Sequence, residues 1–159
     1  MMNKLPLLSG DFFLESYHKL LEISRGDHID QQFTRFSKAF NWSDQYDSSV
    51  LNFEDYEAFV LTDPSYKLLW VDQGFSDMTG YHSHDVIGKK PNMLHGQNTK
   101  DTERKLFRNL LASNEVFTTR ITNHKKSGQA YVCEVKIVPL YNQNNELSHY
   151  IALEREIAA

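Results

Sequence analysis

Cysteine is nearly absent from the sequence, with Cys133 as the one thiol among 159 residues. A lone thiol forms neither an intrachain disulfide nor a CxxC metal or redox motif, so neither can hold this chain together. A chain of this length buries enough apolar surface to fold without such cross-links. Sparse cysteine is typical of a reducing compartment and favours a cytoplasmic protein.

Long apolar runs and an excess of basic charge are also missing. Runs such as "AFVL" and "LLWV" are the longest, far below the roughly 18 residues of a membrane-spanning helix. The N-terminus has one lysine and early acidic residues, which is not typical of a signal peptide. With 17 basic and 21 acidic residues the net charge is −4, which argues against a broad phosphate-binding surface. We therefore expect no membrane segment and no nucleic-acid partner.

Residues 1–52 have the pattern of amphipathic helices. The segments 9–24 and 27–40 place apolar side chains every three or four positions, which predicts two helices. These side chains are Phe13, Tyr17, Leu20, Leu21, Ile29, Phe33, Phe36 and Phe40. Each apolar stripe has to pack against the rest of the chain or against a second copy. We predict a helical extension over residues 1–52 that caps the following domain or mediates dimerisation.

From residue 53 onward the pattern changes to strands and short helices. The predicted strands span residues 57–63, 67–72, 115–123, 129–141 and 147–157, and a longer helix spans residues 100–113. Glycine and proline interrupt the region between the second strand and this helix, so only short elements are expected there. The order predicts an α+β domain over residues 53–159, with a five-stranded antiparallel sheet and helices on one face.

Two long segments of this domain resemble a known family. They are "LTDPSYKLLWVDQGFSDMTGYHSHDVIGKK" and "ITNHKKSGQAYVCEVKIVPLYNQNNELSHYIALERE", which contain "F-x-x-M-T-G-Y", "V-I-G-K" and "K-K-S-G" in order. The segments are similar to PAS sensor domains, nearest to the light-oxygen-voltage (LOV) flavin photoreceptors, over residues 55–157. The resemblance implies a PAS fold, a pocket between helices and sheet, and signalling through the helices that flank the sheet.

The resemblance extends to the individual positions of the flavin site. In LOV proteins a cysteine in the loop "G-x-N-C-R-F-L-Q-G" adds to the flavin under blue light, and the loop "GKKPNMLHG" has Pro91 at that position. Proline has no thiol, so the resemblance implies a sensor without this photochemistry. Asn123 and Arg108 match flavin-contacting residues of the family. The positions that differ are Lys90, Asn92, His95, Cys133 and Glu154.

Strand alternation predicts that several of these side chains face the interior. Cys133 shares its face with Val135, which fits a small buried residue or a displaced reactive thiol. Asn123 is expected to need a polar partner, from a ligand, an internal water or Glu154. Glu154 is either a pocket carboxylate whose burial raises its pKa or a sheet-edge side chain that reaches water. Arg108 is either a solvated side chain or an anion clamp.

The sequence leaves three functions open. One is a PAS sensor or signal-relay module that binds a small ligand or a partner protein without a cysteine adduct. The others are a non-covalent flavin photoreceptor or redox sensor, and a ligand-free dimerisation or scaffold module. Candidate cofactor-binding residues are Asn92, His95, Arg108, Asn123, Cys133 and Glu154. Haem-binding PAS proteins take a histidine from the longer helix, and residues 101–113 contain none. We also expect neither a metal site nor an enzyme active site.

The outer face of the predicted sheet is apolar too. It carries Val132, Val138, Ile151, Leu153 and Ile157. One face of an antiparallel sheet usually meets water, so an apolar outer face implies a cover. We expect the N-terminal helices to supply it, from the same chain or a second copy, and predict a homodimer through these elements. Because the sequence ends just after the last predicted strand, we expect output through a signalling partner in trans or a segment outside this sequence.

Overall fold

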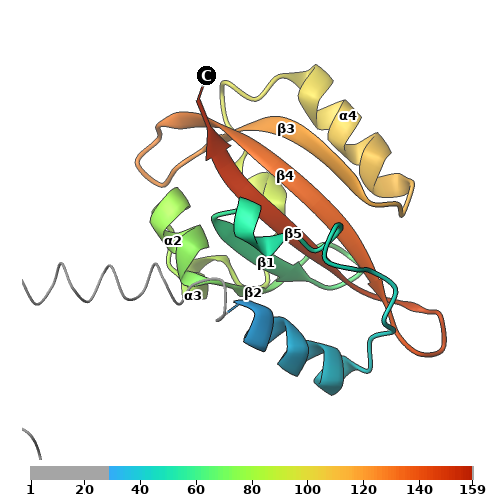
Figure 1. Ribbon diagram of the computed structural model, residues 1–159. Coiled ribbons are helices and arrows are strands. Elements are labelled where there is room, and N and C mark those ends of the chain that lie inside the picture. The colour runs from blue at the N-terminus through green and yellow to red at the C-terminus, as the bar shows by residue number, and fades with distance from the viewer. Residues whose placement is uncertain (1–28, 159) are drawn as a thin grey trace, which may run out of the picture.

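The computed structural model describes residues 29–158. Its strands form one five-stranded antiparallel sheet in the order β2-β1-β5-β4-β3 (Figure 1), which confirms the predicted fold. The strands are β1 Ala58–Thr62, β2 Leu68–Val71, β3 Phe117–His124, β4 Ala130–Tyr141 and β5 Leu147–Ile157. Because β1 pairs with β5, the first and last strands of the domain meet, and β5 lies at the centre of the sheet.

The helices follow the predicted order as well. Short elements connect β2 to a longer helix, α4 Asp101–Ala112. They are α2 Gln73–Thr79, α3 Ser83–Val86 and the 3-10 helix η2 Pro91–Leu94. Another 3-10 helix, η1 Phe53–Asp55, precedes β1, and residues 29–40 are helical, as predicted. The helix predicted over residues 9–24 lies outside the described residues.

Aspartates and a glycine fix the path of the chain between β1 and α3. Asp63 Oδ1 accepts a hydrogen bond from the Lys67 backbone N–H at 3.0 Å, which closes the turn between β1 and β2. Asp72 caps α2 by accepting from the Phe75 N–H at 3.0 Å. The helix ends at Gly80, whose φ of 80° lies in the left-handed region that glycine adopts without strain. These local contacts direct the chain back across the inner face of the sheet.

Two apolar clusters lie on the two faces of the sheet. The inner cluster joins β-strand residues such as Val135 to Phe75 of α2 and Leu94 of η2. At the edge of this layer, Phe107 of α4 contacts Phe117 of β3 edge-on, with ring centroids 5.8 Å apart. The inner layer is therefore built from the sheet and the short helices that follow β2.

The outer face of the sheet is covered from within the same chain. The outer cluster contains Ile29, Trp42, Phe53, Phe59, Leu61, Val138, Leu140, Ile151 and Leu153, with Phe33, Val50 and Leu51 among the side chains packed against it. The helix over residues 29–40 forms part of this cover (Figure 1), whereas a contribution from the helix predicted over residues 9–24 stays a prediction. Since this cover comes from one chain, the homodimer through these elements stays a prediction.

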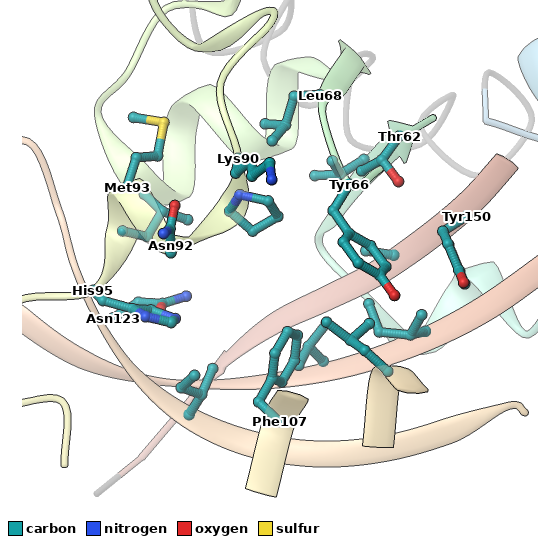
Figure 2. A pocket seen from close by; sticks show the side chains of 18 of the residues that line it. Thr62, Tyr66, Leu68, Lys90, Asn92, Met93, His95, Phe107, Asn123 and Tyr150 are labelled. Carbon is teal, nitrogen blue, oxygen red and sulfur yellow. The ribbon is translucent and has the colours of Figure 1, made fainter. Parts of the chain in front are cut away.

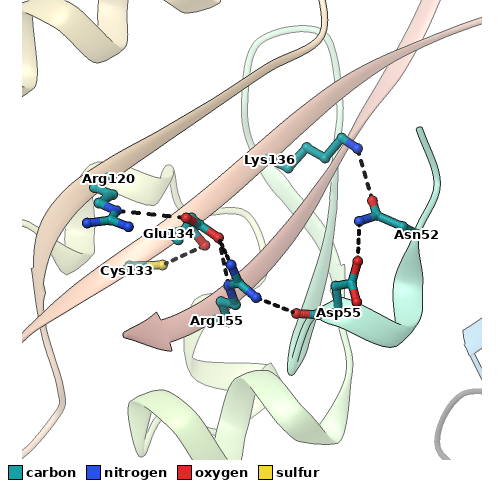
Figure 3. A network of polar contacts seen from close by, with 7 residues as sticks. All are labelled: Asn52, Asp55, Arg120, Cys133, Glu134, Lys136 and Arg155. Carbon is teal, nitrogen blue, oxygen red and sulfur yellow. Dashed lines mark hydrogen bonds and ion pairs between the residues drawn. The ribbon is translucent and has the colours of Figure 1, made fainter. Parts of the chain in front are cut away.

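A polar network borders the outer cluster (Figure 3). Glu134 of β4 accepts from Arg155 Nε of β5 at 2.6 Å, and Arg155 also donates to the Asp55 carbonyl at 3.4 Å. Lys136 Nζ donates to Asn52 Oδ1 at 2.9 Å, and Asn52 donates to Asp55 Oδ2 at 2.7 Å. The network therefore ties η1 and the residue before it to the sheet.

Candidate functional site

A cavity of about 630 Å³ lies between the inner face of the sheet and the segments η2 and α4. Its walls come from all five strands, from Tyr66 in the β1–β2 turn and from both helical segments (Figure 2). The volume falls within the range of small-molecule and cofactor sites. Apolar side chains form most of the wall: Val60, Leu68, Phe75, Met93, Leu94, Phe107, Leu111, Ile121, Val135, Ile137 and Ala152. Such a surface favours a flat or aliphatic ligand body over a strongly hydrated one.

The structure brings five of the six predicted site residues together in the lining of this cavity: Asn92, His95, Arg108, Asn123 and Glu154. The sixth, Cys133, is not among the residues that line the cavity. Its side chain is fully buried within the inner cluster, and the thiol is within 3.8 Å of the Glu134 carbonyl. Alternation predicted the correct face of β4 but not this residue's position relative to the cavity.

Glu154 is the most unusual polar group of the site. It is 8% exposed, and Oε2 has no hydrogen-bond partner among the described residues. Burial, with a smaller contribution from the Asp72 carboxylate, raises the pKa of Glu154 to about 7. The alternative of a sheet-edge glutamate that reaches water was wrong. Glu154 lies on the central strand, opposite Ala58 of β1 on one side and Val135 of β4 on the other.

Asn123 and His95 supply neutral polar groups to the same cavity (Figure 2). Asn123 comes from β3 and is 5% exposed. His95 follows η2, and burial, together with the nearby Arg104, lowers its pKa, so the neutral imidazole is favoured near pH 7. A neutral imidazole and an amide each offer a donor and an acceptor. This part of the cavity can therefore pair with a ligand edge of mixed polarity.

Hydrogen bonds to β3 hold the loop that carries His95. Thr99 Oγ1 donates to the Thr122 carbonyl at 2.5 Å and accepts from the Gly96 N–H at 3.0 Å. An added Cβ at Gly96 would lie 2.5 Å from Nδ1 of the His124 ring, so a larger residue would have to displace this ring or the loop. The loop therefore approaches β3 closely.

Three cations line the cavity from η2 and α4: Lys90, Arg104 and Arg108. Arg104 is already engaged, because it donates to the Gly96 carbonyl at 3.1 Å and forms an ion pair with Asp101 at 3.2 Å. Arg108 is exposed and makes no ion pair with any described residue. An anionic ligand group at the mouth would thus meet an available guanidinium.

Two tyrosines of the lining were missed by sequence reasoning. Tyr66 and Tyr150 have ring centroids 5.1 Å apart, and the Tyr150 hydroxyl donates to Asn114 Oδ1 at 2.6 Å. Tyr66 adopts a φ of 69°, which is uncommon for a residue with a side chain. The turn around "DPSYK" was predicted, but nothing in its sequence indicates that Tyr66 reaches the cavity. Tyr150 shares a strand face with Glu154, and this alternation could have identified it.

Comparison with known proteins identifies the class to which this fold and cavity belong. The family model described as PAS domain matches residues 57–159. The chain belongs to the PAS domain family. Among curated relatives, phototropin-1A of Oryza sativa subsp. japonica is 30% identical over 105 residues, which are 64% of this chain and 11% of that protein. A blue-light photoreceptor of Listeria innocua is 26% identical over 101 residues, 62% of this chain and 40% of that protein. The chain therefore spans a minor part of the length of either relative.

Solved structures support the same fold. The light-state structure of the Aureochrome1 LOV domain superposes with a TM-score of 0.63 at 18% identity, covering 68% of this chain and 87% of the other. The PAS domain of the fruit-fly ELK potassium channel superposes with a TM-score of 0.61 at 21% identity, covering 82% and 98%. Likeness at these identities shows the fold alone.

Neither a membrane-crossing helix nor a metal site is found in the part of the chain that the structure describes. No helix over residues 29–158 is long and apolar enough to cross a membrane. No group of three or more histidine, cysteine, aspartate or glutamate side chains in the same range could hold a metal ion.

Proposed function

We propose that this chain is a cytoplasmic PAS sensor or signal-relay module that binds a small ligand in its inner cavity without forming a cysteine adduct. In this proposal residues 53–159 form the sensor domain and residues 1–52 the extension that caps it. The observation that carries the proposal is the cavity of about 630 Å³, whose lining includes Glu154, a buried residue whose Oε2 has no hydrogen-bond partner among residues 29–158. A carboxylate in such a place is costly unless something pairs with it, and a ligand would do so.

The position of the thiol argues against adduct chemistry. Pro91 lines the cavity at the start of η2 and has no thiol. Cys133, the sole cysteine of the sequence, lies outside the lining, and burial raises the pKa of its thiol well above the ordinary value. The thiolate is the reactive form of cysteine, and a raised pKa keeps the thiol protonated, so this side chain is unreactive.

Flavin is the cofactor that the LOV relatives suggest, and the cavity suits it only in part. The volume and the unpaired Arg108 fit a ring with a phosphate tail. Glu154 fits poorly, because an ionised carboxylate offers only acceptors to a ring edge that is itself rich in acceptors. The buried carboxyl would have to stay protonated, which its pKa of about 7 does not ensure at neutral pH. We therefore attribute no step to flavin.

Packing on the two faces of β5 supports a route for signal relay. Along β5, Glu154 points into the cavity while its neighbour Leu153 packs in the outer cluster. Phe53 and the helix over residues 29–40 pack in that same cluster. A ligand that shifts β5 would thus disturb the contacts of the extension. We propose that the extension reports this change to a signalling partner in trans or to a second copy of the chain.

Native mass spectrometry tests whether the cavity binds a ligand. The full chain, purified without denaturant, is expected to carry a bound small molecule or to gain one from a metabolite library. Ala152→Phe, which places a ring in the cavity, should abolish binding. Leu106→Phe, at an exposed site on α4 that is outside the lining, should leave it unchanged. Equal occupancy of Ala152→Phe and the wild type would contradict the proposal, as would a cavity that takes up no compound.

A further inference from the structure

The geometry points to a specific ligand class, and we propose that the cavity selects planar nitrogen heterocycles that present an amino or ring N–H donor to Glu154 and carry an anionic substituent toward Arg108. This inference rests on the proposed function, because it specifies what the sensor cavity binds. It departs from the flavin of the LOV relatives at the position where this chain has a carboxylate.

The first support is the unfilled acceptor at Glu154. Glu154 Oε2 is buried and lacks a hydrogen-bond partner among the described residues, although its backbone is fully paired in the centre of the sheet. A carboxylate oxygen accepts hydrogen bonds and donates none. A buried acceptor without a donor is destabilising, whereas a ligand N–H at this point would form a charge-assisted bond.

The second support is the charge around Glu154. Three ionisable groups interact electrostatically with Glu154: Asp72 beside α2, and Tyr131 and Cys133 on β4. None of these groups is a cation. The cations of the lining, Lys90, Arg104 and Arg108, come from η2 and α4, and no ion pair links any of them to Glu154 among residues 29–158. No described residue donates a hydrogen bond to Glu154 Oε2, and the Tyr131 hydroxyl is likewise buried without a partner, so a ligand N–H would supply the missing donor.

The third support is the origin of the polar groups in the lining. Glu154 and Asn123 come from the sheet, whereas the cations Lys90 and Arg108 come from the residue before η2 and from α4. Exposed Arg108 on α4 has no carboxylate partner in the described range. A molecule with a flat body, a donor edge and an anionic tail matches this set of groups. A phosphate or carboxylate would serve equally as the tail.

Isothermal titration calorimetry with a small panel tests the inference. The donor-bearing probes are adenosine monophosphate, guanosine monophosphate and pterin-6-carboxylate. Purine riboside monophosphate, which differs from adenosine monophosphate by the amino group alone, is the matched probe without that donor. We expect at least one donor-bearing probe to bind at pH 8, and removal of the amino group from an adenine-type ligand to weaken binding tenfold or more.

Single-residue variants test the proposed contacts of Glu154 and Arg108 with the ligand. Glu154→Gln should weaken the best probe about tenfold, because it replaces a charge-assisted bond with a neutral one. Wild-type affinity should rise between pH 6 and pH 8, because the buried Glu154 carboxyl, with a pKa of about 7, ionises over this interval, and Glu154→Gln should remove this rise. Glu156→Gln, two residues along β5 and paired with Lys125 at 3.0 Å, is the control and should change neither. Arg108→Gln should weaken the anionic probes but not the corresponding nucleosides.

Two results would overturn the inference: no binding of any donor-bearing probe at millimolar concentration, or equal binding of the probe without the amino group. Circular dichroism and thermal melting of each variant establish that it is folded. Native mass spectrometry could identify a cavity ligand that lacks an N–H donor. That result would overturn this inference but leave the proposed sensor function intact. If Ala152→Phe and the wild type also take up ligands equally, the sensor function itself fails.

Discussion

The buried carboxyl of Glu154 makes the stability of the ligand-free protein depend on pH in a calculable way. Its pKa rises from 4.5 in the unfolded chain to about 7 in the fold. The folded state therefore holds this proton more tightly. The resulting stabilisation is fully present below about pH 4.5 and is lost as the pH rises through 7. The difference between the two pKa values corresponds to about 3 kcal/mol of unfolding free energy.

Glu154→Gln removes the titration and keeps the shape of the side chain. Urea denaturation between pH 4.5 and 8 should show the wild type losing about 3 kcal/mol relative to the variant across this interval. Comparing the two proteins cancels the groups they share, including His95 and His149, whose pKa values are lowered by burial. Glu156→Gln should follow the wild-type curve. Parallel curves for the wild type and Glu154→Gln would refute the claim that this carboxyl is buried without a partner.

Further substitutions probe the cover and the loop. Trp42→Phe removes the Nε1–H that donates to His149 Nδ1 at 3.1 Å and should cost about 1 kcal/mol in urea denaturation. Since burial lowers the pKa of His149 below 6.5, stability should fall as the pH drops through its folded pKa, and His149→Gln should flatten that decline. Gly96→Ala should destabilise by about 1–3 kcal/mol because its Cβ meets the His124 ring, with His124→Ala restoring much of the loss in a double-mutant cycle. Leu153→Ala should cost about 2–5 kcal/mol, and a loss below 1 kcal/mol would mean that the cover is not packed.

Local pattern was sufficient to predict the elements of this fold. Alternation along β4 and β5 gave both their bounds and their inward faces, because a strand with period 2 separates its two faces unambiguously. The same alternation predicted that the Glu154 side chain faces inward. It did not indicate that β5 is the central strand, since that depends on pairing between β1 and β5, about 90 residues apart in sequence. The edge-glutamate alternative failed for this reason.

The candidate site was harder to predict from the sequence than the fold. Cys133 faces inward as predicted, yet whether an inward residue reaches a cavity depends on how neighbouring side chains fill the space, which no periodicity encodes. Tyr66 enters the lining through a left-handed backbone conformation at the end of a turn. The apolar stripe over residues 27–40 required a cover partner, but a stripe alone does not distinguish its own chain from a second copy.

The central claim is that the cavity can bind a ligand but cannot form a thiol adduct. The most direct test is a blue-light difference spectrum of the full chain saturated with flavin mononucleotide, followed by a measurement of the intact mass of the protein. The account predicts no reversible bleaching of any bound flavin and an unchanged protein mass, since Pro91 has no thiol and Cys133 lies outside the cavity. Bleaching that recovers in the dark, with flavin attached to the peptide containing Cys133, would contradict it.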